Sequence, residues 1–400
     1  MRFLLAPLSS CVLAASVLWI ALNSSNALAQ TTTSSGVTQI VYAAEGSTLV
    51  TWDVNPQTFQ ATQAGTTTLP QTVYPGMLTS PDGHFLYYTA YANYSQQNYE
   101  LYVYATNAAG VPQGAPVQQI EFSGMSNFVI DPTGQFAYAV LTGPAGSQTT
   151  PYSIIGYQRN SRTGQLGNPV TEATYNLSNS VGGLTCELGL LGFSPHGDQL
   201  YDLVYCFAPT GSSASYTYSA RHVNPNNGSL AQDVEFYSWT NDNGGGELVQ
   251  PVRNLFFDFV DPDPSIPEPT QVNVYPMQPH SSTPLIQCTS SMQAACGSFI
   301  APLAHPSGRY VFIYDSSYLT DILRVDVPNQ QLTLTNSSIP YEVQQFSPDG
   351  SIAYAVYDDF EGELNIEIYG FNTSNAALTP GGTITLPTDS YPWYAAERYP

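Results

Sequence analysis

The sequence contains no lysine, and its eight basic side chains are all arginines, set against 30 aspartates and glutamates. The formal net charge is −22 at pH 7. A nucleic-acid-binding protein needs a stripe of basic side chains to neutralise phosphates, and an anionic membrane repels a strongly acidic protein. The composition therefore argues against both kinds of partner. It is typical of a surface kept soluble by its charge outside the cell.

Long apolar runs are also scarce, and the one at the N-terminus, residues 12–22, is too short to span a bilayer comfortably. Arg2 is the only charge in residues 1–29, and Ala27-Leu28-Ala29 fits a small-x-small cleavage site. We expect a signal peptide over residues 1–29, cleaved near Ala29, followed by a flexible leader over residues 30–36. The mature protein would then be secreted or periplasmic. An uncleaved N-terminal anchor is the alternative.

Cysteine is sparse, with five in the chain, and Cys11 lies in the predicted signal peptide. The four that remain, an even number suited to an exported protein, are Cys186, Cys206, Cys288 and Cys296. Cys186 lies ten residues before His196 and Cys206 ten after it, so a hairpin centred there would make them face each other. Among three connectivities we favour 186–206 with 288–296. Free buried thiols are the alternative.

What the sequence repeats is a tight turn followed by a short apolar strand. In Ser347-Pro348-Asp349-Gly350, proline and aspartate favour a turn and glycine tolerates a positive φ, while alternate residues of the next segment are apolar. Further copies lie at residues 80–83, 131–134, 194–197 and 305–308. Their glycines are separated by 51, 63, 111 and 42 residues, so the long gap fits two units, with residues 254–259 as a strand of a degenerate copy.

A second marker, a strand that ends in an asparagine-rich hairpin, follows each turn. Asn55, Asn107 and Asn160 are 52 and 53 residues apart, and later copies lie at residues 223–228, 325–329 and 369–372. This period predicts an all-β fold, a seven-bladed β-propeller of four-stranded antiparallel blades, as one domain over residues 37–400. Within a blade we label the strands a to d from the axis outward. Strands near residues 39–42 and 393–400 would pair and close the ring.

With these turns and this blade count, the chain resembles the lactonase-like family of seven-bladed propellers, which is similar to propeller-type 6-phosphogluconolactonase and to fungal muconate-lactonising enzymes. The resemblance covers residues 37–400 and rests on the turns at residues 80–83 and 347–350 and on the hairpin Tyr157-x6-Gly164-x-Leu166. It implies the fold and a lactone-opening activity. A phosphorylated substrate would need basic groups at the ligand site, however, and the histidines at positions 84, 196 and 305 belong to a–b turns, where we expect them to be solvated.

Acidic and aromatic residues are predicted to gather on the face that carries the d–a and b–c connections, which we call the loop face. The opposite face, with the a–b turns and c–d hairpins, is the turn face. Tyr74 and Tyr91 accompany the acids on the loop face. The binding candidates there are Glu187, Asp242, Glu247, Asp315, Tyr318, Tyr341, Glu342, Asp358, Asp359 and Trp393.

Three interpretations of this face stay open: a Ca²⁺ site built from carboxylates, a site where tyrosines stack on neutral sugars or assist acid–base chemistry, and ordinary solvated loops. The sequence identifies no cofactor, and Ca²⁺ is the one candidate ion. We favour a monomeric binding protein for a carbohydrate, a cation or a protein partner. The alternative is a hydrolase that opens a small neutral sugar lactone, with or without a metal, and the sequence leaves catalytic residues unidentified.

Overall fold

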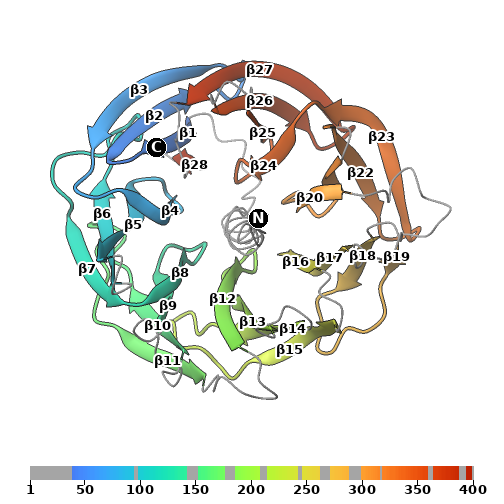
Figure 1. Cartoon of the computed structure of the whole chain (residues 1–400), viewed down its shortest axis with the longest axis horizontal. Coiled ribbons are helices and arrows are strands. Elements are labelled where there is room, and N and C mark those ends of the chain that lie inside the picture. The colour runs from blue at the N-terminus through green and yellow to red at the C-terminus, as the bar shows by residue number, and fades with distance from the viewer. Residues whose placement is uncertain are drawn as a thin grey trace, which may run out of the picture.

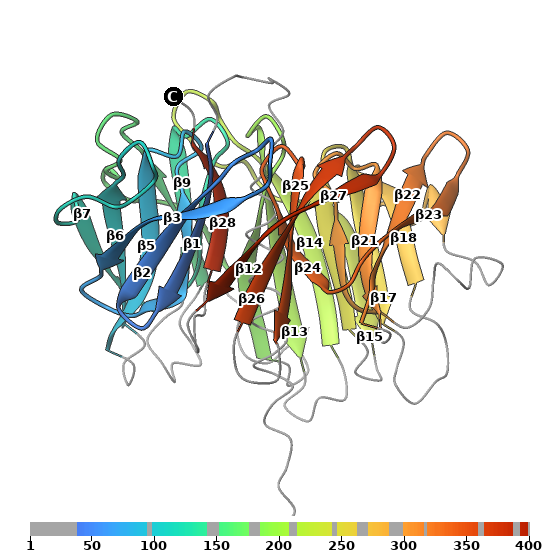
Figure 2. The ribbon, with the colours of Figure 1, turned by 90° about the horizontal axis from the view of Figure 1, so that it is seen from above.

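The computed structural model describes residues 38–93, 98–141, 152–175, 185–207, 214–241, 246–261, 271–287, 299–315, 318–358, 364–386 and 393–398. In them, seven four-stranded sheets form a ring, and all strand pairs are antiparallel (Figures 1 and 2). This confirms the predicted seven-bladed propeller. The predicted signal peptide, the leader and Cys288 and Cys296 lie outside the described residues. No helix in the described part of the chain is long and apolar enough to cross a membrane.

The blades follow one another along the chain, each built in the order a, b, c, d. Blade 1 consists of β4 (Val73–Thr79), β5 (Phe85–Asn93), β6 (Asn98–Ala105) and β7 (Gln118–Ser123). Blade 2 consists of β8 (Met125–Ile130), β9 (Phe136–Leu141), β10 (Tyr152–Gln158) and β11 (Val170–Tyr175). Blade 3 consists of β12 (Thr185–Phe193), β13 (Gln199–Phe207), β14 (Ala214–His222) and β15 (Val234–Asn241).

Blade 4, which was predicted from the degenerate copy, consists of β16 (Gly246–Val252), β17 (Leu255–Asp261), β18 (Gln271–Pro276) and β19 (Ile286–Gln287). Blade 5 consists of β20 (Phe299–Ala304), β21 (Tyr310–Asp315), β22 (Thr320–Asp326) and β23 (Gln331–Ile339). Blade 6 consists of β24 (Glu342–Phe346), β25 (Ile352–Asp358), β26 (Leu364–Asn372) and β27 (Ala377–Leu386).

Blade 7 joins the two ends of the chain. Its a strand is β28 (Trp393–Arg398), and its b, c and d strands are β1 (Thr38–Glu45), β2 (Thr48–Val54) and β3 (Ala61–Thr68). The pairing runs from Thr38 opposite Arg398 to Ala43 opposite Trp393. The predicted closure is therefore present, and it leaves β1 without an open edge.

The a–b turns have one hydrogen-bond pattern that explains why the motif recurs. In the copy at residues 347–350, the Gly350 N–H donates to the Ser347 carbonyl (2.8 Å), and Gly350 has φ +74°. The glycines at positions 83, 134, 197 and 308 repeat this bond and have φ between +68° and +72°. Such a positive φ strains any residue with a Cβ, which is why glycine ends each copy.

Five of the described c–d hairpins are closed by the side chain of their first asparagine, at positions 55, 107, 160, 224 and 372, and several of these hairpins bind the neighbouring blade. Asn160 Oδ1 accepts from the N–H groups of Arg162 (3.0 Å) and Thr163 (3.1 Å). In the same hairpin the Gly164 carbonyl accepts the hydroxyl of Tyr87 from blade 1 (2.5 Å), and the Phe85 ring packs on the glycine so closely that a Cβ there would lie 2.3 Å from it. Tyr138 and Tyr42 bond the hairpin glycines of the following blades in the same way.

The core lies between the blades rather than inside them. Each hydrophobic cluster draws residues from at least two neighbouring blades, and the largest fully buried side chains are tyrosines and phenylalanines. Two glutamines add polar contacts between innermost strands. Gln345 on β24 donates to the Ala395 carbonyl (2.9 Å) and accepts from the Ala395 N–H (3.0 Å) on β28. Gln250 on β16 bonds the backbone of β20 in the same manner.

The expectation that His305 is a solvated turn histidine is wrong. Its side chain is fully buried, and its ring lies against Phe312, Phe346 and Phe371. One ring nitrogen, Nε2, lies 2.9 Å from the Gly350 carbonyl oxygen, so the imidazole joins the a–b turns of blades 5 and 6. His196, by contrast, is exposed, as expected for a turn residue.

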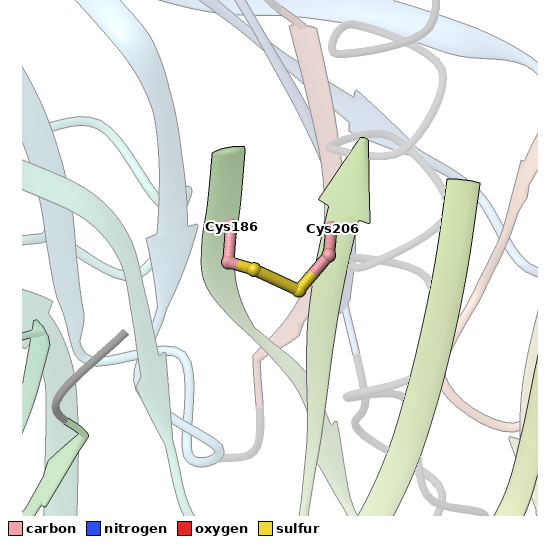
Figure 3. Close-up of a disulfide and its surroundings, with 2 residues drawn as sticks. All are labelled: Cys186 and Cys206. Carbon is pink, nitrogen blue, oxygen red and sulfur yellow. A yellow bond between two sulfur atoms is a disulfide. The ribbon is translucent and has the colours of Figure 1, made fainter. Parts of the chain in front are cut away.

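Cys186 on β12 and Cys206 on β13 form a disulfide, as the sequence predicts (Figure 3). The two residues are directly opposite each other in the strand register, with their Cα atoms 3.9 Å apart. The bond therefore ties the a and b strands of blade 3 together next to their loop-face ends. It is consistent with an oxidising compartment outside the cytoplasm.

Candidate functional site

The loop face is formed by the first residues of the a and c strands and the last residues of the b and d strands. Glu187 and Glu342 stand at the start of β12 and β24, and Tyr341 lies in the d–a connection that leads into β24. Tyr318 lies just before β22, is 67% exposed and has φ +64°, a conformation uncommon outside glycine. These four candidates therefore lie on the face where the sequence placed them.

For the remaining candidates the structure gives the backbone position alone or no position. The backbones of Glu247 and Trp393 lie at the starts of β16 and β28, and those of Asp315 and Asp358 end β21 and β25, so all four stand at loop-face ends of strands. Asp242 and Asp359 lie outside the described residues. The backbone positions of these four residues agree with the predicted loop face, whereas the binding role of each side chain stays a prediction.

Basic residues are segregated to the opposite face. In the described part of the chain, every arginine and histidine lies in an a–b turn, in a c–d hairpin or in the turn-face half of a strand. Two of the arginines are buried there: Arg159 bonds the Tyr87 hydroxyl (2.7 Å), and Arg221 pairs with Asp202 (2.7 Å). An anionic ligand at the loop face would therefore meet carboxylates and no described cation.

A carboxylate and three aromatic rings form one row across blade 3. Glu187 is directly opposite Tyr205, Tyr205 is opposite Tyr216, and Tyr216 is opposite Trp239, so the row crosses all four strands from the axis outward. The Tyr205 and Tyr216 rings stack with centroids 4.7 Å apart, and Trp239 follows at 5.5 Å. Because directly opposite residues point to the same side of a sheet, all four side chains share one surface of the blade.

Two other blades carry stacked tyrosines at the same face. In blade 1, the Tyr74 ring stacks on Tyr91 (4.3 Å), which contacts Tyr99 (4.7 Å), and Tyr74 remains 47% exposed. In blade 6, Tyr341 stacks on Tyr357 with centroids 4.2 Å apart. Stacked rings of this kind offer apolar surface together with hydroxyl groups, which suits ligands that have both apolar and hydroxyl-bearing faces.

Burial at this face raises the pKa values of two carboxyl groups and one tyrosine, which favours their protonated forms. Desolvation raises the pKa of the Glu342 carboxyl, although a hydrogen bond from Gln344 opposes the shift. Desolvation also raises the pKa of Glu187, even though much of the Glu187 side chain is exposed. Tyr152 at the start of β10 has its pKa raised to about 12, first by burial and then by the charge of Glu187.

Within the described residues, no three histidine, cysteine, aspartate or glutamate side chains come together as a metal site would require. Glu187 and Glu342 belong to different blades, so the described acids are dispersed around the ring. Ca²⁺ binding stays a prediction for the loop face as a whole, because Asp242 and Asp359 lie outside the described residues.

Sequence reasoning missed Tyr205, Tyr216 and Trp239, which the strand register brings into line with Glu187. A signal was available. In blades 1 and 3, an aromatic residue near the end of the b strand faces an aromatic residue near the start of the c strand, Tyr91 with Tyr99 and Tyr205 with Tyr216. The register of the hairpin decides which residues meet, and the loop between the strands had no turn motif from which that register could be read.

Comparison with solved structures supports the fold. A candidate 6-phosphogluconolactonase from Bacteroides uniformis superposes with a TM-score of 0.55 and 14% sequence identity, covering 90% of this chain and 99% of that chain. A second candidate 6-phosphogluconolactonase, from Bacteroides fragilis, gives a TM-score of 0.50 and 13% identity, covering 90% of this chain and 100% of that chain. At this identity the likeness concerns the fold. No protein-family model and no curated protein matches the chain.

Proposed function

We propose that the chain is an exported binding protein that holds an uncharged, hydroxyl-bearing ligand, a carbohydrate, at its loop face. The row of Glu187, Tyr205, Tyr216 and Trp239 carries the proposal. Aromatic rings pack against the apolar face of a sugar, and a carboxylate accepts hydrogen bonds from its hydroxyl groups. The segregation of all described basic side chains to the turn face supports an uncharged ligand rather than a phosphorylated or carboxylated one.

The proposal is tested by calorimetric titration of residues 30–400 with neutral saccharides and with a sulfated saccharide of equal length. We expect the neutral saccharide to bind and the sulfated one to bind weakly or not at all. Trp239→Ala should weaken binding about fivefold, since an aromatic contact contributes on the order of 1 kcal/mol. Val170→Ala is the matched control, because Val170 is exposed but lies at the turn-face end of β11. Preference for the sulfated saccharide would contradict the proposal.

A second candidate function is hydrolysis of a neutral sugar lactone. It is favoured by the raised pKa values of the Glu187 and Glu342 carboxyls, since a general acid or base works best with a pKa near the working pH. Glucono-lactone opening, followed as acid release, should then fall on Glu187→Gln or Glu342→Gln. Turnover of 6-phosphogluconolactone is not expected from a face without described cations. Equal rates for wild type and both variants would remove this candidate.

A further inference from the structure

A tyrosine recurs at one position of the repeat, at the start of the c strand. It stands eight residues before the first residue of the c–d hairpin in four blades: Tyr99 before Asn107, Tyr152 before Asn160, Tyr216 before Asn224 and Tyr318 before Asp326. The hydrogen bonds confirm that these positions are equivalent. The residue just before each hairpin, for example Arg159 or Val325, donates its N–H to the carbonyl of the residue that follows the a–b turn glycine.

The fold does not require a ring at this position. Blade 6 has Leu364 there, eight residues before Asn372, and blade 7 has Ser47, eight residues before Asn55. Both blades nevertheless form complete four-stranded sheets of the same topology. Tyr318 is 67% exposed and so contributes little to any core. Packing alone therefore does not account for a tyrosine in four blades.

Three of these tyrosines belong to consecutive blades. Tyr99, Tyr152 and Tyr216 come from blades 1, 2 and 3, which are neighbours in the ring (Figure 1). Each is half-buried, packs against a hydrophobic cluster and stands near the loop-face start of its c strand. Two of them also contact a second tyrosine ring: Tyr99 contacts Tyr91, and Tyr216 stacks on Tyr205.

Equivalent rings on successive blades present the same contact several times along an arc. A ligand that uses such an arc should itself be repetitive, with one unit for each blade. We propose that the loop face of blades 1–3 binds one extended, uncharged polysaccharide chain, with a sugar residue against the tyrosine at the start of each c strand. This inference rests on the proposed carbohydrate-binding function and names the ligand as a polymer rather than a single sugar.

Linked contacts predict a dependence on chain length, because the second and third contacts become intramolecular once the first has formed. The probes are glucose, mannose and the tetra- and hexasaccharides of the cello-, malto- and manno- series, titrated calorimetrically into residues 30–400. In the series that binds, we expect the hexasaccharide to bind at least about tenfold more tightly than the monosaccharide.

The chain itself supplies the substitution for the test, because Leu364 shows that leucine fits this position of the repeat. Tyr99→Leu, Tyr152→Leu and Tyr216→Leu should each weaken hexasaccharide binding about three- to tenfold, and the triple variant should abolish it. Thermal midpoints close to wild type would show that the blades remain intact. Val170→Ala is the control, since Val170 is exposed at the turn-face end of β11, and it should leave affinity unchanged. Tyr318→Leu probes the same position of the repeat in blade 5, outside the arc.

The binding experiments distinguish failure of the polysaccharide inference from failure of the proposed carbohydrate-binding function. Saccharide binding that is unaffected by the three leucine variants, or that is equally tight for monosaccharide and hexasaccharide, would overturn the inference and leave the proposed function standing. Loss of binding in Tyr318→Leu but not in Tyr152→Leu would also overturn it, because the ligand would then lie on another part of the face. If none of the neutral saccharides binds, the proposed function fails and the inference fails with it.

Discussion

At the scale of single residues, His305 is the clearest titratable group with a structural role. The Ser307 N–H donates to Nδ1 (3.1 Å), so the remaining ring proton lies on Nε2 and is donated to the Gly350 carbonyl. Burial lowers the pKa of His305 from 6.5 to about 4, although the hydrogen bond to Gly350 opposes the shift. The folded protein therefore holds this imidazole in its neutral form.

Because the folded pKa lies below the unfolded one, the unfolded chain takes up the proton first as pH falls. The stability that depends on neutral His305 is complete above about pH 6.5 and is lost as pH falls to about 4, a total of about 3 kcal/mol. Urea unfolding of wild type and His305→Gln at pH 7 and pH 5 checks this, with exposed His196→Gln as control. The wild type should lose more stability between the two pH values than His305→Gln, and equal losses would contradict the assignment.

A substitution at Gly164 tests the contact between Phe85 of blade 1 and the c–d hairpin of blade 2. It has φ +72°, and a Cβ there would lie 2.3 Å from Phe85 Cδ1, whereas at Gly114, with φ +64°, nothing lies within 4 Å. Both alanine variants strain the backbone, but only Gly164→Ala also displaces the Phe85 ring. We expect Gly164→Ala to lower the free energy of unfolding by about 1–3 kcal/mol more than Gly114→Ala, measured by urea titration. Similar losses would mean that Phe85 moves aside freely.

At the scale of elements, side chains join the innermost strands of neighbouring blades, because the described strands form seven separate sheets. Gln345→Leu would leave the Ala395 N–H and carbonyl on β28 without their partner. A buried polar group left unpaired costs about 1–3 kcal/mol, so the variant should be less stable than wild type by about 2–4 kcal/mol in urea unfolding. Gln331→Leu, at an exposed position of β23, is the control. A loss of stability no larger than that of Gln331→Leu would show that water replaces the two hydrogen bonds of Gln345.

At the scale of the whole molecule, one antiparallel pair closes the ring. Removal of residues 393–400 takes away β28 and opens the edge of β1 from Thr38 to Ala43. Exposed strand edges pair with other chains, so we expect a lower thermal midpoint and oligomers in size-exclusion chromatography. A synthetic peptide of residues 393–400 should restore both properties by adding the missing strand. A truncated protein that stays monomeric with an unchanged midpoint would show that closure contributes little to stability.

The sequence largely predicted which face of the molecule carries the acidic residues. Alternation of strands and turns places each loop on one of two faces, so acids near d–a and b–c connections had to gather on the loop face, where Glu187 and Glu342 lie. The repeated turn glycines likewise predicted the blade count, because a positive φ at Gly83 or Gly350 is a local requirement of the turn. Such features depend on a few consecutive residues, and composition and spacing reveal them directly.

The sequence by itself therefore determined the strands, the turns, the number of blades, the closure and the pairing of Cys186 with Cys206. Only the tertiary structure decided that His305 is buried under the turn of the next blade, and that Tyr205, Tyr216 and Trp239 line up with Glu187. The physical reason is the separation along the chain of the residues that each interaction brings together. Turn chemistry and strand alternation act over a few residues, whereas burial between blades and register across four strands depend on surfaces that meet only when the ring has closed.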